Sequence, residues 1–468
     1  MQDFGTLLHT YLKDKHNYSI SAFAKDIGIS AGLLNHIFNG KRTMSTEKFL
    51  LTINSGLFDL EERNNLRTAY FINRYGEKDY ESIFLFSETL KKFRFGDPPE
   101  IVDCTNVRSN GYGEFTESNE VFSALRELFL GTGNTIYTNI PHANTLINHV
   151  LYKLKMDYPD SRMTRFIPCF SAKFTQKSLT TLFSILRFAK IKVPTLSLEN
   201  AEVDHLDKTT LFPYFVISDN MIIILDCQCK KGISFTGNIV KDKYRVTEEV
   251  AHNSAEAVHF FANELTAANY IINYEDHFIY ALKSTPCFLA VNDLDYLLTA
   301  ADTFPNKEEL LAYLDNRRSD KQWINFYTQT GLERFLESGK SYELSETYIK
   351  RFPIKLRMEF LESLISTIKT DRTHHNFFLS RTTKVSDFFN NVDIIVYDKS
   401  CLIATTYETP NETSFIGEIS IHIPGGEFLR IIKKYVSDYL PICGDVISKQ
   451  TALLYLNGLL IDLQRRSE

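Results

Sequence analysis

The chain has 468 residues, enough for two to four domains of ordinary size, with 44% hydrophobic and 24% charged residues. Its formal net charge of −6 excludes a protein whose whole surface is a basic coat for nucleic acid, but it allows a small DNA-binding module on an acidic body. The seven cysteines are odd in number and irregularly spaced, which argues against a disulfide framework and predicts a reduced, cytoplasmic protein.

The chain also lacks the sequence signals of a membrane or secreted protein. The longest aliphatic run, Met221–Leu225, is too short to cross a bilayer. The first fifteen residues have neither the basic start nor the apolar stretch of a signal peptide. We therefore expect no membrane partner.

Residues 1–75 have the apolar spacing of successive helices. Ser45 is a candidate cap for one of them, and residues 59–75 form another with a charged face. Residues 76–94 fit one more helix, and the segment Gly96-Asp97-Pro98-Pro99 predicts a break after it. This divides the first part into a domain over residues 1–75 and a helical linker over residues 76–100.

Beyond residue 100 the pattern predicts a mixed α/β (α+β) region. Helices are expected over residues 120–130, 144–156, 178–188, 248–265, 357–370 and 426–439, and strands over 134–140, 212–217, 221–227, 392–397, 401–405 and 416–423. Two strand pairs are each joined by a turn with an aspartate, Asp219 or Asp398, and each is followed by a helix. Two related subdomains over residues 101–275 and 276–468 would explain this order, and a chance echo within an α/β chain is the alternative.

Residues 19–42 carry the pattern of a helix-turn-helix. This motif needs a small residue where its helices approach, a turn residue that tolerates a positive φ, and a cap for the second helix. Ala24, Gly28 and Ser30 occupy these positions. The inward apolar positions are also filled at the right spacing, by Phe23, Ile27, Ile29, Leu34 and Ile37. An ordinary helix pair shares single features of this set but not their combination, so we predict an all-α helix-turn-helix domain.

This segment resembles the Cro/repressor class of bacterial and phage regulators, the XRE family, over roughly residues 4–70. Its most specific matches are Gly28-Ile29-Ser30 and Asn39-Gly40-Lys41-Arg42. Two positions depart from the family pattern, because Ile20 stands where the family often has Gln and Phe38 where it often has Glu. The missing Gln removes a frequent DNA contact, while the hinge positions of the motif are kept.

The resemblance implies that the outward side of the second helix enters the major groove of double-stranded DNA. Asn35 could bond to the edge of an adenine, although a plain solvated Asn is the alternative, and His36 could donate to guanine or phosphate. Lys41 and Arg42 would neutralise phosphates at the helix exit. The implied DNA-binding residues are Ser30, Ala31, Gly32, Asn35, His36, Asn39, Lys41 and Arg42.

The charge of the first domain is low for a DNA-binding module. Residues 1–60 contain six Lys or Arg and five Asp or Glu, which leaves a net charge of +1. One such module should bind DNA weakly, so we expect a homodimer that engages two half-sites.

No motif supports catalysis or a bound metal. Cys227 and Cys229 lack the further ligands of a zinc site, and the glycines at 131 and 133 precede an expected strand where a phosphate cradle would precede a helix. The chain has no GxSxG elbow, HExxH pair or P-loop. We therefore expect neither an enzyme nor a cofactor.

Residues 101–468 are too large for dimerisation alone and are interpreted as a sensor region. The leading hypothesis is a sequence-specific transcription regulator whose DNA binding is modulated by a small molecule, peptide or partner protein. One alternative is an enzyme fused to a DNA-binding module, which predicts a deep pocket with convergent polar groups. The other is an interaction protein with a repurposed helix-turn-helix, which Ile20, Phe38 and the near-neutral charge favour.

Overall fold

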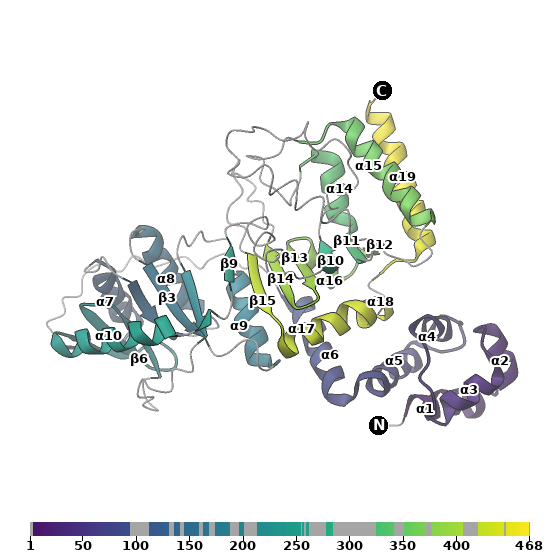
Figure 1. Cartoon of the computed structure of the whole chain (residues 1–468), viewed down its shortest axis with the longest axis horizontal. Coiled ribbons are helices and arrows are strands. Elements are labelled where there is room, and N and C mark those ends of the chain that lie inside the picture. Colours follow the sequence, from purple (N-terminus) through teal and green to yellow (C-terminus); the bar gives the residue numbers. More distant parts are fainter. Residues whose placement is uncertain are drawn as a thin grey trace.

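The chain folds into a helical N-terminal part followed by two parts built on β-sheets (Figure 1). The computed structural model describes residues 3–93, 112–130, 135–140, 145–158, 162–167, 174–187, 196–200, 213–253, 255–256, 259–261, 278–283, 324–340, 351–370, 376–405, 420–443 and 446–467. The expectation of a helical first region and a mixed later region is confirmed at this level. The predicted break at residues 96–99 and the glycines at 131 and 133 lie outside the described residues.

Seven helical segments form the N-terminal part. They are α1 (Phe4–Thr10), the π-helical turn η1 (Tyr11–Lys15), α2 (Ile20–Asp26), α3 (Ala31–Phe38), α4 (Thr46–Ile53), α5 (Leu60–Tyr75) and α6 (Glu77–Lys92). The hydroxyls of Ser19, Ser30 and Ser45 each accept a backbone N–H of the helix that follows. Asp59 and Glu62 form a reciprocal capping box at the start of α5. These local signals fix where the helices begin, and they confirm the predicted cap at Ser45.

The first sheet has the strand order β1-β7-β6-β5-β2-β3-β4-β8. Its strands are β1 (Tyr112–Phe115), β2 (Thr135–Thr138), β3 (Arg162–Ile167), β4 (Leu196–Asn200), β5 (Tyr214–Ile217), β6 (Met221–Leu225), β7 (Gly232–Thr236) and β8 (Ala255–Glu256). Helices α7 (Ser118–Leu130), α8 (Thr145–Asp157) and α10 (Asn238–Asn253) accompany it, while α9 (Gln176–Arg187) packs against α6 in the core of the second sheet region. Strands β2, β3 and β4 are parallel neighbours, and the other pairings are antiparallel.

The second sheet has the strand order β12-β11-β10-β13-β14-β15-β9. Its strands are β9 (His259–Phe261), β10 (Phe278–Lys283), β11 (Ile324–Thr328), β12 (Asn376–Leu379), β13 (Val392–Tyr397), β14 (Ser400–Thr405) and β15 (Ser420–Pro424). Its helical segments are α14 (Gln329–Ser338), α15 (Ile354–Thr370), α16 (Lys384–Phe389), α17 (Gly426–Lys434), the π-helical η4 (Tyr435–Tyr439), α18 (Leu440–Ile442) and α19 (Lys449–Ser467). Because β9 pairs with β15, this sheet includes residues that precede position 276.

Apart from β8, the strands of the first sheet follow the same order as those of the second. The first sheet then reads β4-β3-β2-β5-β6-β7-β1 and the second reads β12-β11-β10-β13-β14-β15-β9. Strands at corresponding places in the two sheets follow the same order along the chain, and corresponding neighbours pair in the same parallel or antiparallel sense. A glycine with positive φ follows β7 and β15 alike, Gly237 (98°) and Gly425 (29°), and a helix starts directly after each corner. The two strand pairs with an aspartate turn are the β5–β6 and β13–β14 hairpins.

The predicted bounds of the helix over residues 248–265 are wrong. Helix α10 starts ten residues earlier, at Asn238, and ends at Asn253. The sequence signal for its start is Gly237, where the chain turns directly from β7 into the helix. Phe260 and Phe261, which looked like part of a helical face, instead pair with β15, where Phe260 lies opposite Ile421.

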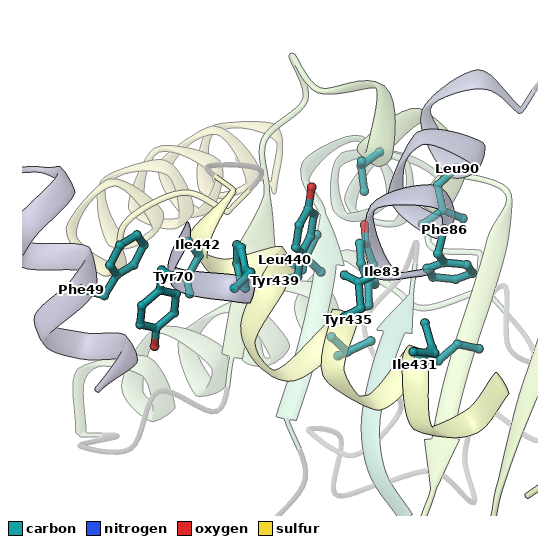
Figure 2. Close-up of a cluster of buried hydrophobic side chains, with 14 of the residues drawn as sticks. Phe49, Tyr70, Ile83, Phe86, Leu90, Ile431, Tyr435, Tyr439, Leu440 and Ile442 are labelled. Atoms are coloured by element: carbon teal, nitrogen blue, oxygen red, sulfur yellow. The ribbon is translucent and has the colours of Figure 1, made fainter. Parts of the chain in front are cut away.

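A continuous apolar core joins the N-terminal helices to the second sheet region. Figure 2 shows buried side chains of α4, α5 and α6 lined up along α17, η4 and α18. Phe71 of α5 lies 4.9 Å from Tyr439, and Phe86 of α6 lies 5.0 Å from Tyr435, both measured between ring centroids. The helix-turn-helix region is thus packed against the second sheet region through α6 and η4.

Across the residues that the structure describes, none of the helices is both long enough and apolar enough to pass through a bilayer.

Candidate nucleic-acid interface

The segment over residues 19–42 contains two short helices, α2 and α3, joined by a tight turn. Helix α2 ends at Asp26, Gly28 adopts a φ of 65°, and the backbone N–H of Ile29 donates to the carbonyl of Ala24 over 2.9 Å. The hydroxyl of Ser30 then accepts the N–H of Leu33 over 3.1 Å and starts α3. A residue with a Cβ would be strained at Gly28, so the glycine sets the angle between the two helices.

The inward positions of the motif are buried as the sequence pattern predicts. Phe23, Ala24, Ile27, Leu34 and Ile37 are each at most 3% exposed. This shared core holds α3 against the rest of the domain, because each of these side chains has an apolar partner on a neighbouring helix.

Gly5 is a positioning residue that the sequence analysis missed. A Cβ built on Gly5 would lie 2.1 Å from the carbonyl oxygen of Ile37, so α1 and α3 touch through their backbones at this point. Glycine inside an expected helix, at a place where no turn is predicted, was the available signal. The contact fixes the C-terminal end of α3, next to the predicted phosphate-binding residues.

The outward side of α3 carries the predicted DNA-binding residues. Gly32, Asn35 and His36 are exposed, and Ala31 is half-buried. Lys41 and Arg42 are exposed just beyond the helix, where the backbone N–H of each donates to the carbonyl of His36. The structure thus brings these six residues together on one side of the motif.

Two of the predicted residues already serve the helix ends. Ser30 uses its hydroxyl as the N-cap of α3, and the side-chain amide of Asn39 donates to the carbonyl of Asn35 over 2.8 Å. Both remain exposed. A phosphate contact from either would have to share these groups with the helix ends.

The two cations after α3 differ in their electrostatic surroundings from Lys15 and Lys48. Within the described part of the chain, neither Lys41 nor Arg42 has an acidic partner, so both charges remain available to an anion. Lys15, by contrast, is 2.8 Å from the buried Glu62 carboxylate. Lys48 lies 3.5 Å from Glu47.

Glu62 organises the side of the domain around η1 and α5. Burial of its carboxylate raises its pKa, but hydrogen bonds from Lys15, the Asp59 backbone and His16 outweigh this and leave the pKa below the usual value of 4.5. His16 Nε2 is 3.0 Å from this carboxylate. The carboxylate therefore stays charged at neutral pH and ties η1 to α5.

The two departures from the family pattern are structural. Phe38 is 9% exposed and packs its ring edge-on against His9, with centroids 4.9 Å apart. Ile20 is half-buried and packs against the same core. Apolar side chains at these positions contribute to packing, so a polar residue at either would lose buried apolar contact.

The helix-turn-helix domain is bonded to the second sheet region through Asp438 of η4. The Asp438 carboxylate accepts the hydroxyl of Tyr75 and lies 3.4 Å from both the Thr46 hydroxyl and the Arg74 Nε. Burial raises the pKa of Asp438, and the charge of Arg74 only partly offsets this effect. Thr46 is the first residue of α4, so this contact reaches the helix-turn-helix domain directly.

Helix α6 makes a second set of polar contacts to the same region. The Asp79 carboxylate pairs with Arg430 and Lys434 of α17, and Lys78 lies 3.2 Å from Glu427. The hydrogen bond from Arg430 lowers the pKa of Asp79 to about 2, helped by Lys434 and against the effect of burial. These charged pairs join α6 to α17, two of the helices that also contribute to the apolar cluster of Figure 2.

No family model and no curated protein matches the sequence. Two solved structures show a low similarity. A phosphatidylserine synthase of Haemophilus influenzae Rd KW20 has a TM-score of 0.24 at 11% identity, covering 82% of this chain and 97% of its own. The archaeal chromatin protein TrmBL2 has a TM-score of 0.21 at 10% identity, covering 55% of this chain and 94% of its own. Within the described residues, no three His, Cys, Asp or Glu side chains gather as a metal site would require.

Proposed function

We propose that the protein is a sequence-specific DNA-binding transcription regulator. The observation that carries the proposal is the outward side of α3, where exposed Asn35 and His36 lie next to the uncompensated charges of Lys41 and Arg42. Asn and His are residues that bond to base edges, and Lys and Arg bind phosphate. The helix that presents them is fixed by a turn, a cap and a buried core. The resemblance to the XRE family supports the same assignment.

The C-terminal region is proposed to modulate this binding in response to a small molecule, peptide or partner protein. Two features support the proposal. Asp438 joins η4 to α4 and α5, and Asp79 joins α6 to α17. A change in η4 or α17 would therefore alter the contacts of these N-terminal helices. Its two sheets share one strand order, which supports two related subdomains that arose by duplication. A coupling of this kind requires an effector that binds one arrangement of these contacts better than the other.

The first test is DNA binding by the purified full-length protein to fragments around its own gene, at two salt concentrations, with unrelated DNA as competitor. Selective and salt-sensitive binding is expected. Absence of selective binding under all of these conditions would instead favour an interaction protein. The low net charge of +1 over residues 1–60 is consistent with that alternative.

Replacing Lys41 and Arg42 together by alanine should weaken binding to every sequence by a similar factor. Each lost phosphate contact should reduce the slope of log K against log salt by about 0.9. The matched control is the exposed pair Lys230 and Lys231 in the turn between β6 and β7, replaced in the same way. A salt slope that is equal in both double variants would remove Lys41 and Arg42 from the interface.

Asn35→Ala should relax the preference at a single base pair. We expect a loss of about 1–3 kcal/mol on the preferred fragment and almost none on a fragment with that base pair changed. Competition binding against a set of single base-pair variants measures this difference. A uniform loss across the whole set would show that Asn35 does not contact a base.

A further inference from the structure

Helix α19 combines two properties that rarely occur together on a protein surface. Its residues 450–461 contain no charged side chain, although the helix ends carry Lys449, Asp462, Arg465 and Arg466. Two large apolar residues in this uncharged stretch are exposed, Leu454 (72%) and Ile461 (48%). Leu454 is the most exposed of the large hydrophobic side chains described. Depletion of charge around exposed apolar side chains is the composition of an interface centre.

Among the residues that the structure describes, α19 packs against its neighbours through one broad side. Ala452, Leu456 and Leu463 are buried in a core shared with α14 and α15. The opposite side carries Leu454, Asn457, Gly458 and Ile461, at the spacing of residues three, four and seven positions apart that share a helix face. We name these four residues the α19 stripe.

Gly458 lies at the middle of the stripe and is unexplained by the fold of a single chain. A Cβ placed there would meet nothing within 4 Å, so no neighbouring group requires a glycine. Glycine inside a helix costs about 0.5–1 kcal/mol relative to alanine. A missing side chain at this point lets a second helix approach closely.

We propose that the α19 stripe is a homodimer interface, in which α19 pairs antiparallel with α19 of a second copy. A twofold axis between positions 457 and 458 sets Leu454 opposite Ile461 of the other copy, and Asn457 opposite its Gly458. Apolar side chains then meet at both ends of the contact, and the backbones approach at its centre. The stripe is therefore complementary to itself, as a twofold interface requires.

The position of α19 in the molecule fits this occupant. Along the long axis, α19 lies at the same end as the helix-turn-helix domain, while the first sheet lies at the other end (Figure 1). This inference rests on the proposed function in one respect, since a module with a charge of +1 needs a second copy to bind two half-sites.

Another exposed apolar pair, on α10, makes a useful comparison. Ile239 (64%) and Val246 (44%) are also seven residues apart, but the charged Asp242 and Lys243 lie between them. Helix α10 belongs to the end of the molecule away from the helix-turn-helix domain (Figure 1). It therefore supplies a matched surface that the proposal predicts to be free in solution.

The test is sedimentation equilibrium of the full-length protein without DNA, across a wide range of concentration. Two helices of about 28 Å bury less area than a standard interface, so we expect a dimer that dissociates on dilution. Leu454→Glu should halve the mass at concentrations where the wild type is dimeric. Gly458→Glu should do the same, and because it improves helix propensity it cannot act by unfolding α19. Ile239→Glu, the control, should leave the dimer intact.

Each outcome decides the proposal. A wild-type protein that stays monomeric overturns it, as does a dimer that survives both α19 variants or is lost in Ile239→Glu. Because the mass is measured without DNA, its result is independent of whether the protein binds DNA. A dimer that depends on α19 but shows no selective DNA binding would refute the proposed function and keep the interface.

Discussion

At the scale of single residues, Asp438 is the best probe of how the helix-turn-helix domain is held. Burial raises the pKa of its carboxyl above 3.8, so the folded protein keeps the neutral form to a higher pH than the unfolded chain does. A group with a raised pKa stabilises the fold most at low pH, and this contribution is lost as the pH rises through the folded pKa. Asp438→Asn mimics the neutral form at every pH. We therefore expect the variant to gain stability relative to the wild type as the pH rises from about 3.8 toward neutrality.

Denaturant unfolding of both proteins at several pH values measures this difference. Asp438→Ala provides the contrast, since it removes the carboxylate that accepts from Thr46 and Tyr75 and should cost about 1–3 kcal/mol at neutral pH. A gap between wild type and Asp438→Asn that stays constant with pH would show that the carboxyl is not desolvated in solution.

At the scale of elements, local sequence signals predicted the caps and the turn of the N-terminal helices. They could not predict how these helices pack against distant parts of the chain. The caps at Ser30 and Ser45 and the turn at Gly28 are properties of adjacent residues, so the sequence reveals them directly. The helix at residues 76–94 was predicted as a linker helix, but its partners lie about 350 residues away, in α17 and η4. Strand β7 was overlooked because it is only five residues long and begins with a glycine. As a result, the start of α10 was predicted too late in the chain.

Helix α6 offers a prediction with an internal control. Phe86 is fully buried between α9, α17 and η4, with ring partners Phe183, Phe428 and Tyr435. Phe86→Ala should cost about 3–5 kcal/mol of stability, because the removed ring leaves a cavity among them. Phe84, two residues earlier, is 44% exposed, and its replacement by alanine should cost no more than about 0.5 kcal/mol. Chemical denaturation compares the two variants. Similar losses of stability would mean that α6 does not pack against α9, α17 and η4 through Phe86.

At the scale of the whole molecule, the fold places the N-terminal helices, which we propose to bind DNA, at one end of the molecule (Figure 1). These helices are joined to the second sheet region by a common core and by the contacts of Asp79 and Asp438. The first sheet repeats the strand order of the second but lies toward the far end (Figure 1). Among the described residues, the contacts that join the second sheet region to the N-terminal helices involve α6, α17 and η4, so a signal that changes these helices would reach the helical part that contains α3. Sequence could suggest the repeat from its two aspartate turns, but the full strand order required the pairing of distant strands.

If two copies join at the α19 stripe, DNA with two half-sites should be bound much more tightly than DNA with one. The second half-site is then engaged within the complex, which raises overall affinity by about 10²–10⁴ when the spacing fits. The expected spacing is one or a few helical turns of about 10 base pairs. Leu454→Glu should abolish this advantage and leave the affinity for a single half-site unchanged, because Leu454 belongs to α19, which lies apart from α3 in the molecule (Figure 1). Binding titrations on one-site and two-site fragments measure both quantities. If the variant kept the full advantage of two sites, the two modules would have to be joined by a surface other than α19.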